Sequence, residues 1–249
     1  MILNPYRFAS AGTPFDGFGN ASRNFGGSNE DIDMGDVLGS VFSGGAGEKF
    51  TIALWMKADV IEDAVLVNRF LTTGNNREFV FRLTATGELQ MYMTSDGTSA
   101  NAFGRNTSTS GSITAATWFH VAVVYDQSAT DEYVKMYIDG TEYNDAALVN
   151  AGTTGTFTSI KAGTATLRLG EYSFSAVQLN GKLADVRIYD ADVGASVITG
   201  LSNGTDYQTN LVGWWLTDVN DTGAIVDYSI NSNDGTNTGT VYSTDGPAD

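Results

Sequence analysis

The chain contains no cysteine, one histidine, three prolines and few basic residues. Without cysteine it can form no disulfide, thiolate zinc site or cysteine nucleophile. Its single histidine, His120, excludes a multi-histidine metal site within one chain. The 13 Lys and Arg residues against 29 Asp and Glu residues give a net charge of -16. Because this charge repels nucleic-acid phosphates and anionic lipids, nucleic acid is not an expected partner.

Long apolar runs are also missing. No stretch approaches the ~20 apolar residues that a membrane-spanning helix needs, so we expect no membrane insertion. The first residues lack the basic head and apolar stretch of a secretory signal. We therefore expect either that a signal has been removed or that the protein leaves its cell by another route.

The chain does contain alternation of apolar and polar residues with a period of two, while helical periodicity is nearly missing. This alternation predicts strands over residues 50–55, 78–83, 88–93, 118–125, 133–138, 165–169, 182–189 and 211–216. Asp-Gly and Asn-Gly dipeptides lie between several of them, and these residues adopt the positive φ of tight turns at low cost. The clearest case is a hairpin over residues 135–143 that turns at Asp139-Gly140.

One short helix is predicted at Asp192–Leu201, with Asp192 as its N-cap. The scarcity of proline leaves the strands free to pair. No linker, low-complexity tract or repeat divides the chain, so we expect an N-terminal arm over residues 1–19 and a single domain over residues 20–249. The predicted fold class is all-β, an antiparallel two-sheet sandwich with at most one short helix.

Five segments, in order along the chain, resemble successive blocks of the laminin-G-like branch of the concanavalin A-like jelly rolls. They are Asn24–Gly35 (NFGGSNEDIDMG), Phe50–Lys57 (FTIALWMK), Trp118–Asp126 (WFHVAVVYD), Val134–Gly140 (VKMYIDG) and Gly181–Asp190 (GKLADVRIYD). The resemblance implies a concanavalin A-like jelly roll over most of the chain. That fold hosts lectins, carbohydrate-binding modules, glycoside hydrolases and structural domains, so function has to be argued from site residues.

Carboxyl groups suited to glycoside hydrolysis are hard to find in the sequence. The resemblance would require Glu-x-Asp-x-Glu, or the same triplet one residue longer, along one strand, and the chain has neither. The nearest cluster, Glu30-Asp31-Ile32-Asp33, offers no second glutamate at that spacing. His120 falls inside an alternating strand block, which favours a structural role over general-base catalysis. We therefore expect no enzyme activity, and a glycan hydrolase or lyase acting through Asp31 or Asp33 is the third hypothesis.

Jelly rolls of this kind often hold a calcium ion at the rim, and calcium favours oxygen ligands in loops. The resemblance implies a calcium site formed by Asp185 and the loop over residues 24–33, in which Asn29 or Asp31 completes the shell. An alternative of equal weight is that Asp185 pairs with Arg187, and that Asn29 and Asp31 shape their loop through hydrogen bonds to the backbone. Calcium is the one cofactor that the sequence suggests.

Aromatic rings are the other route to sugar binding, since a ring face stacks on the apolar face of a pyranose. Trp214 and Trp215 are adjacent, and adjacent strand residues point to opposite faces, so one of them is a candidate stacking platform. The favoured alternative places one Trp in the core and its neighbour under a loop. Tyr172 is a further candidate for glycan binding, as are Tyr92 and Phe174.

The composition suits a protein that works outside cells, yet the chain starts without an export signal. This combination is typical of phage structural proteins, which reach the outside by lysis. The opening Asn4-Pro-Tyr-Arg-Phe8 also resembles the start of laminin-G-like proteins encoded by tailed phages. We therefore expect a non-enzymatic bacteriophage virion surface protein, such as a capsid decoration or fibre component. Its arm would dock on other virion subunits through Leu3, Tyr6 and Phe8. The alternative is a secreted bacterial carbohydrate-binding or adhesion module.

These two hypotheses set the expected location and partners. The first places the protein on the exposed surface of a virion, and the second places it outside the cell. Cell-surface or mucus glycans are expected partners in both cases. Association into a homo-oligomer is also expected.

Overall fold

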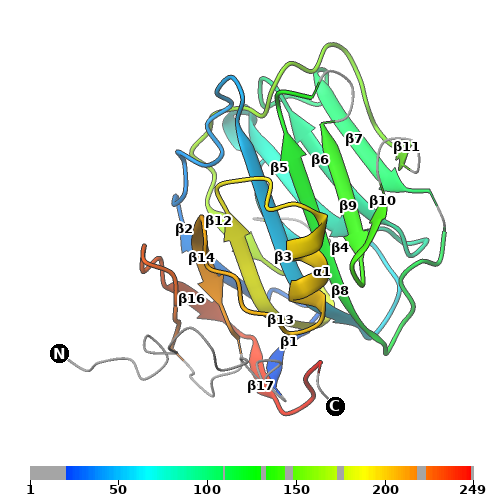
Figure 1. Cartoon of the computed structure of the whole chain (residues 1–249), viewed down its shortest axis with the longest axis vertical. Coiled ribbons are helices and arrows are strands. Elements are labelled where there is room, and N and C mark those ends of the chain that lie inside the picture. Colours follow the sequence, from blue (N-terminus) through cyan, green and yellow to red (C-terminus); the bar gives the residue numbers. More distant parts are fainter. Residues whose placement is uncertain are drawn as a thin grey trace.

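The computed structural model describes residues 21–108, 110–129, 133–143, 148–172, 177–217 and 223–247. Within these residues the chain forms two antiparallel β-sheets packed face to face, with one short α-helix on the outside (Figure 1). This confirms the predicted all-β sandwich. The expected N-terminal arm, with Leu3, Tyr6 and Phe8, lies outside the described residues.

One sheet lies directly behind the helix α1 (Ala195–Ser202) in Figure 1, and we call it the helix-side sheet. Its strands follow one another in the order β10 (Thr141–Tyr143), β9 (Val134–Ile138), β8 (Trp118–Asp126), β3 (Lys49–Ala58), β13 (Asn180–Tyr189), β1 (Ser22–Gly26) and β17 (Val241–Ser243). A further strand, β14 (Leu211–Trp215), pairs with the second half of β13, beyond the part that pairs with β1.

The other sheet lies on the opposite side of the core from α1, and we call it the far sheet. Its strands follow one another in the order β11 (Leu148–Asn150), β7 (Ala102–Thr107), β6 (Leu89–Thr94), β5 (Asn76–Leu83), β4 (Ala64–Leu71), β12 (Leu167–Leu169), β2 (Asp31–Gly35), β16 (Gly235–Thr238) and β15 (Ala224–Ile225). A 3-10 turn, η2 (Thr73–Asn75), connects β4 to β5.

Strand β3 shows why these segments form a sandwich. Phe50, Ile52, Leu54 and Met56 alternate along it and pack in the core between the sheets. The intervening Ala53 belongs to a second apolar cluster, on the outer face of the same sheet. Because β3 is buried on both faces, its sequence is almost continuously apolar rather than cleanly alternating.

Helix α1 covers the outer face of the helix-side sheet. Ile198 and Leu201 are its buried residues, and they pack with Ala122 and Tyr189 of the sheet. Burial of each aliphatic side chain contributes about 1.5–3 kcal/mol, which is enough to hold a short helix in place. None of the helices in the described ranges is long and apolar enough to cross a membrane.

The local sequence predictions are largely confirmed. Each predicted strand overlaps a strand of the structure, with shifts at the ends. Asp139 (φ 49°) and Gly140 (φ 74°) form the predicted two-residue turn between β9 and β10. The predicted helix start is wrong, because α1 begins at Ala195 with Gly194 as its N-cap. Asp192 instead accepts a hydrogen bond from the Gly194 N–H at 2.8 Å and so shapes the turn before the helix.

Candidate functional site

The outer face of the far sheet carries a group of aromatic, basic and amide side chains. Phe81 and Met91 are paired across β5 and β6 and lie in the core. Successive strand residues point to opposite faces, so Tyr92, Arg82 and Gln90 face outward. This surface is on the opposite side of the molecule from α1.

Three rings from different parts of the chain meet on this face. The Phe70 ring centroid lies 6.2 Å from that of Tyr92 and 5.1 Å from that of Tyr172, and all three side chains are half-buried. The chain turns toward Tyr172 at Gly170, whose φ is 86° and where an added Cβ would lie 2.3 Å from the Phe25 ring. We call Phe70, Tyr92 and Tyr172 the aromatic cluster.

Two arginines flank the aromatic cluster. The Arg77 guanidinium lies 5.9 Å from the Phe70 ring centroid. Burial raises the pKa of Tyr92, and the charges of Arg77 and Arg82 act in the opposite direction. Burial likewise raises the pKa of Tyr172, against the charge of Arg82 and a hydrogen bond from it. Both phenols are therefore neutral hydrogen-bonding groups at neutral pH, and they lie beside fixed positive charges.

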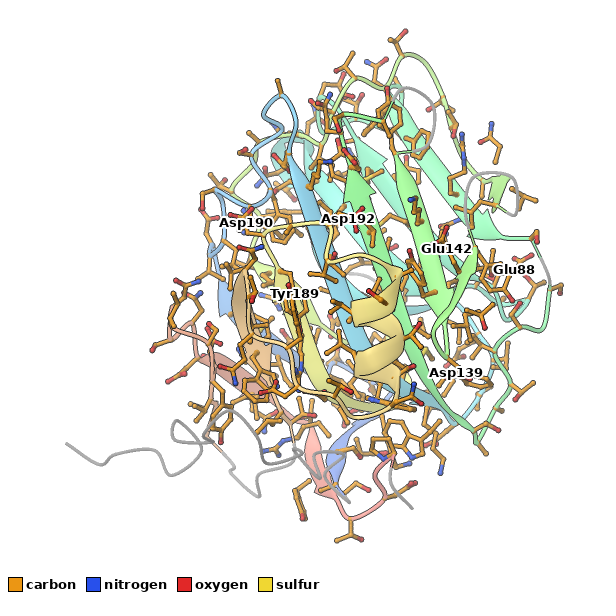
Figure 2. All side chains as sticks on the ribbon, in the orientation of Figure 1. Glu88, Asp139, Glu142, Tyr189, Asp190 and Asp192 are labelled. Carbon is orange, nitrogen blue, oxygen red and sulfur yellow. The ribbon has the colours of Figure 1, made fainter. Side chains whose placement is uncertain are left out.

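A chain of hydrogen bonds orients the polar groups next to the rings. Arg82 Nε donates to Gln90 Oε1 at 2.6 Å, and Gln90 Nε2 donates to Asn106 Oδ1 at 2.7 Å. Asn106 Nδ2 in turn donates to Glu88 Oε2 at 3.2 Å, and Glu88 is labelled near the edge of the molecule in Figure 2. Groups held in this way lose little entropy when they bind a ligand.

Asn68 supplies a further acceptor in the same region. It pairs with Val80 on one side and Arg168 on the other, and it is fully buried. Its Nδ2 donates to the carbonyl of Glu171 at 2.8 Å, whereas its Oδ1 has no hydrogen-bond partner among the described residues. A buried acceptor without a donor costs free energy, so Asn68 is a local cost to stability next to the rings.

The two tryptophans predicted as a stacking platform do not form one. Trp215 is fully buried between the sheets, and Trp214 is 5% exposed in the cluster beneath α1. Both indole N–H groups are used, by the carbonyl of Asn233 and by Asp185 Oδ1 respectively. The platform prediction is therefore wrong, because both faces of β14 are covered. Tyr172, by contrast, is brought to the aromatic cluster.

The calcium ligands implied by the resemblance are not brought together. Asp185 lies on β13 of the helix-side sheet and accepts a hydrogen bond from Arg187 Nε at 2.9 Å, as the alternative predicted. Asp31 lies on β2 of the far sheet, 2.5 Å from Arg168. Asn29 adopts φ 56° in the turn before β2. The described part of the chain contains no group of three or more His, Cys, Asp or Glu residues able to hold a metal ion.

The residues considered for catalysis are engaged in structural contacts. The Arg168 guanidinium lies 2.5 Å from both the Asp31 and the Asp33 carboxylates. His120 is 2% exposed, and its ring meets the Trp55 ring edge-on at 5.4 Å. Burial, assisted by the charge of Arg187, lowers the pKa of His120 to about 3. The imidazole is therefore neutral at neutral pH.

A separate hollow on the helix-side sheet is too small for a sugar. Its volume is about 80 Å³, well below the ~300 Å³ at which ligand pockets begin. It is lined by Val124, Asp126, Ala129, Tyr133, Lys135 and Asp192. The aromatic cluster and its polar neighbours are the candidate functional site because they bring rings, a guanidinium group and amides together on one face. Of these residues, the sequence singled out only Tyr172 and Tyr92.

The chain matches a protein-family model over most of its length. Residues 29–199 match the family model described as the concanavalin A-like lectin/glucanases superfamily. This range covers most of the chain. No curated protein sequence matches the chain.

Solved structures share the fold at low sequence identity. A candidate carbohydrate-binding protein from Bacteroides ovatus has a TM-score of 0.62 and 18% identity, over 90% of this chain and 59% of that one. The heptameric SAP-like pentraxin from Limulus polyphemus has a TM-score of 0.57 and 14% identity, over 89% and 94%. The CBM40 of the Ruminococcus gnavus IT-sialidase, bound to α2,3-sialyllactose, has a TM-score of 0.53 and 16% identity, over 75% and 100%. The chain thus spans less than two thirds of the Bacteroides ovatus protein.

Proposed function

The chain belongs to the concanavalin A-like lectin/glucanases superfamily, and we propose that it is a non-enzymatic carbohydrate-binding protein that binds glycans at the aromatic cluster of the far sheet. The observation that carries this proposal is the meeting of three half-buried rings with oriented guanidinium and amide groups. Saccharides present an apolar ring face and a rim of hydroxyls, and these two kinds of group match them.

In the proposed binding mode the rings stack on the sugar and the polar groups bind its hydroxyls. A ring of the aromatic cluster stacks on the C–H face of a sugar, which removes apolar surface from water. The half-buried Arg82 and Asn106, which the buried Gln90 amide links and orients, hydrogen-bond to the hydroxyls and thereby select their geometry.

This proposal corresponds to the secreted carbohydrate-binding or adhesion module, the alternative to a virion surface protein. Two of the structures described above come from proteins named for carbohydrate binding. The virion role gains no support from the comparisons. A location outside the cell is proposed together with the function.

The absence of catalysis is part of the same proposal. Support comes from Asp31 and Asp33, whose carboxylates share one guanidinium, that of Arg168. Both carboxylates are taken up by this ion pair, whereas glycoside hydrolysis needs two carboxyl groups that face the substrate as acid and as base or nucleophile.

Affinity electrophoresis through gels that contain soluble polysaccharides tests the site. We expect at least one polysaccharide to retard the protein, and we expect the variants Tyr92→Ala and Phe70→Ala to migrate without retardation in that gel. Tyr143→Ala is the matched control, because Tyr143 is a half-buried aromatic residue on the edge strand β10 of the other sheet. If the two site variants were retarded as strongly as the control, the aromatic cluster would not be the site.

A further inference from the structure

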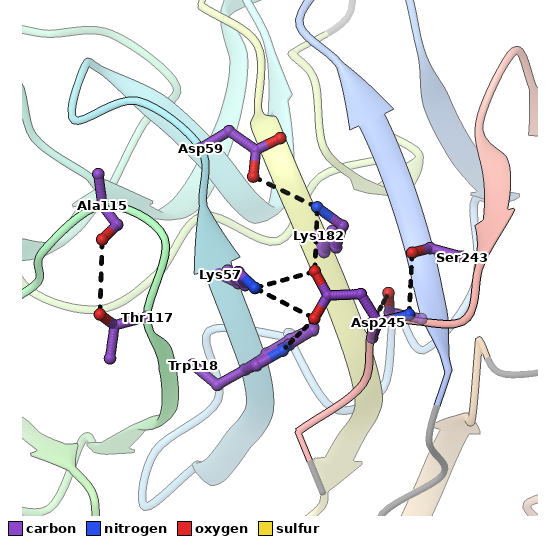
Figure 3. Close-up of polar contacts among 9 residues, drawn as sticks. Lys57, Asp59, Ala115, Thr117, Trp118, Lys182, Ser243 and Asp245 are labelled. Carbon is purple, nitrogen blue, oxygen red and sulfur yellow. Dashed lines mark hydrogen bonds and ion pairs between the residues drawn. The ribbon is translucent and has the colours of Figure 1, made fainter. Parts of the chain in front are cut away.

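A second polar site lies on the outer face of the helix-side sheet, where three donors converge on the Asp245 carboxylate (Figure 3). Lys57 Nζ lies 2.9 Å from Oδ2 and 3.1 Å from Oδ1. Trp118 Nε1 donates to Oδ1 at 3.0 Å, and Lys182 Nζ lies 3.5 Å from Oδ2. We call Lys57, Trp118 and Lys182 the carboxylate seat.

The carboxylate seat belongs to the framework of the sheet. Lys57 is on β3, directly opposite Trp118 on β8 and Lys182 on β13, so the three side chains form one row across paired strands. The lysine side chains are 18% and 12% exposed, respectively. Their positions are therefore set by the centre of the sheet and do not depend on the C-terminal segment.

Asp245, in contrast, belongs to a lightly attached segment. It follows β17, a strand of three residues at the edge of the sheet. Its carbonyl accepts a hydrogen bond from Ser22 Oγ at 2.7 Å, and its side chain is 35% exposed. Short edge segments of this kind open locally at low free-energy cost.

Electrostatics favour an anion in the carboxylate seat whether or not Asp245 supplies it. Without the Asp245 carboxylate, the partly buried Lys57 and Lys182 ammonium groups would face each other, with Asp59 3.3 Å from Lys182. Leaving such charges uncompensated is costly. The protein as a whole carries a net charge of -16 and repels anions at long range, so an acidic ligand needs local donors of this kind.

We propose that the carboxylate seat binds the carboxylate of an acidic saccharide, and that Asp245 occupies it in the free protein as a displaceable intramolecular substitute. The carboxylate chemistry follows from the three donors, whereas the choice of a saccharide rests on the proposed function. Trp118 is half-buried and adds an aromatic surface beside the two ammonium groups. The site is separate from the aromatic cluster, since the two lie on different sheets.

The test follows the indole N–H signal of Trp118 by NMR, identified with the Trp118→Phe variant. The full chain carrying Asp245→Ala is titrated with sodium glucuronate, sodium acetate and glucose. Asp190→Ala is the control with the same charge change, at an exposed site (Figure 2). We expect glucuronate to shift the signal saturably in Asp245→Ala, at roughly tenfold lower concentration than in the wild type or the control, and we expect glucose to have no effect. Adding Lys57→Gln should weaken glucuronate binding about tenfold or more.

Each other outcome counts against part of the proposal. The proposal is overturned if folded Asp245→Ala shows no saturable shift of the Trp118 signal with glucuronate or acetate. If the alanine variant does not fold, Asp245→Asn, which keeps the side-chain shape, is tested by the same criterion. Acetate binding as tightly as glucuronate overturns the saccharide assignment. Tyr92→Ala separates the two sites, because it should abolish binding at the aromatic cluster and leave the Trp118 titration unchanged.

Discussion

Arg82 and Gln90 lie directly opposite each other on β5 and β6, and the guanidinium Nε donates to the amide Oε1 at 2.6 Å. This contact determines the orientation of the Gln90 amide. Because Gln90 then donates to Asn106, the orientation is passed to a second amide. One charged side chain thus arranges most of the polar groups beside the aromatic cluster.

Replacing Arg82 with alanine should therefore weaken glycan binding while leaving the fold intact. The variant loses a charge-assisted hydrogen bond to the ligand, which is worth about 1.5–3 kcal/mol, or roughly a 10–150-fold increase in Kd. Isothermal titration calorimetry with a fragment of the polysaccharide that the protein binds measures this change in Kd. Lys135→Ala, at a half-buried basic residue on β9, is the control. Equal affinities of the Arg82 variant and the wild type would remove Arg82 from the site.

Glycan binding at the aromatic cluster should not require calcium. The carboxylates considered as ligands, Asp31 and Asp185, are each paired with a guanidinium, that of Arg168 and that of Arg187. We expect the same retention on an immobilised glycan in calcium and in chelator. Retention that disappears with the chelator and returns with added calcium would contradict this expectation and restore the calcium site implied by the family resemblance.

Asp227 should be among the most important side chains for stability. It is 2% exposed, and its carboxylate accepts hydrogen bonds from the N–H groups of Trp214, Ser229 and Asn233 and from the Ser229 hydroxyl. Asp227→Ala leaves several buried donors unpaired, so we expect the free energy of unfolding to fall by at least about 3 kcal/mol in urea denaturation. Asp190→Ala, at an exposed position, should change it by less than about 0.5 kcal/mol.

His120 should make stability depend on pH. Burial, with the charge of Arg187, lowers its folded pKa to about 3, against an ordinary value of 6.5. Between these values the unfolded chain binds a proton that the folded chain does not, so stability falls as the pH falls below 6.5. This amounts to about 2 kcal/mol at pH 5. His120→Phe should show a correspondingly smaller loss of stability between pH 7 and pH 5 than the wild type, and an identical loss in both proteins would contradict the assignment.

The sequence predicts the strands that alternate regularly and misses those that do not. β3 and β8 are long, apolar and in register over nine pairs, so their pattern is clear. In β4 the pairing shifts between Val65 and Val67 and again between Arg69 and Phe70. Each irregularity changes which face the next residue occupies, and the period-two signal is lost. The sequence pattern therefore does not indicate Phe70, although it is central to the aromatic cluster.

The candidate site depends on relationships that a single sequence does not contain. The approach of Tyr172 to Phe70 joins the turn after β12 to the end of β4, two segments far apart in the chain. Trp214 and Trp215 illustrate the converse case. Their adjacency correctly places them on opposite faces of a strand, but the cover over the second face comes from α1 and its neighbours, which strand periodicity does not reveal.

A glycan array probed with the wild-type protein and with Tyr92→Ala tests the central claim most directly. The account predicts that the wild type binds one or more related glycans and that the single substitution removes those signals while the variant keeps the wild-type thermal unfolding profile. Wild-type binding that persists undiminished in Tyr92→Ala, or a wild type that binds no glycan at all, would contradict it.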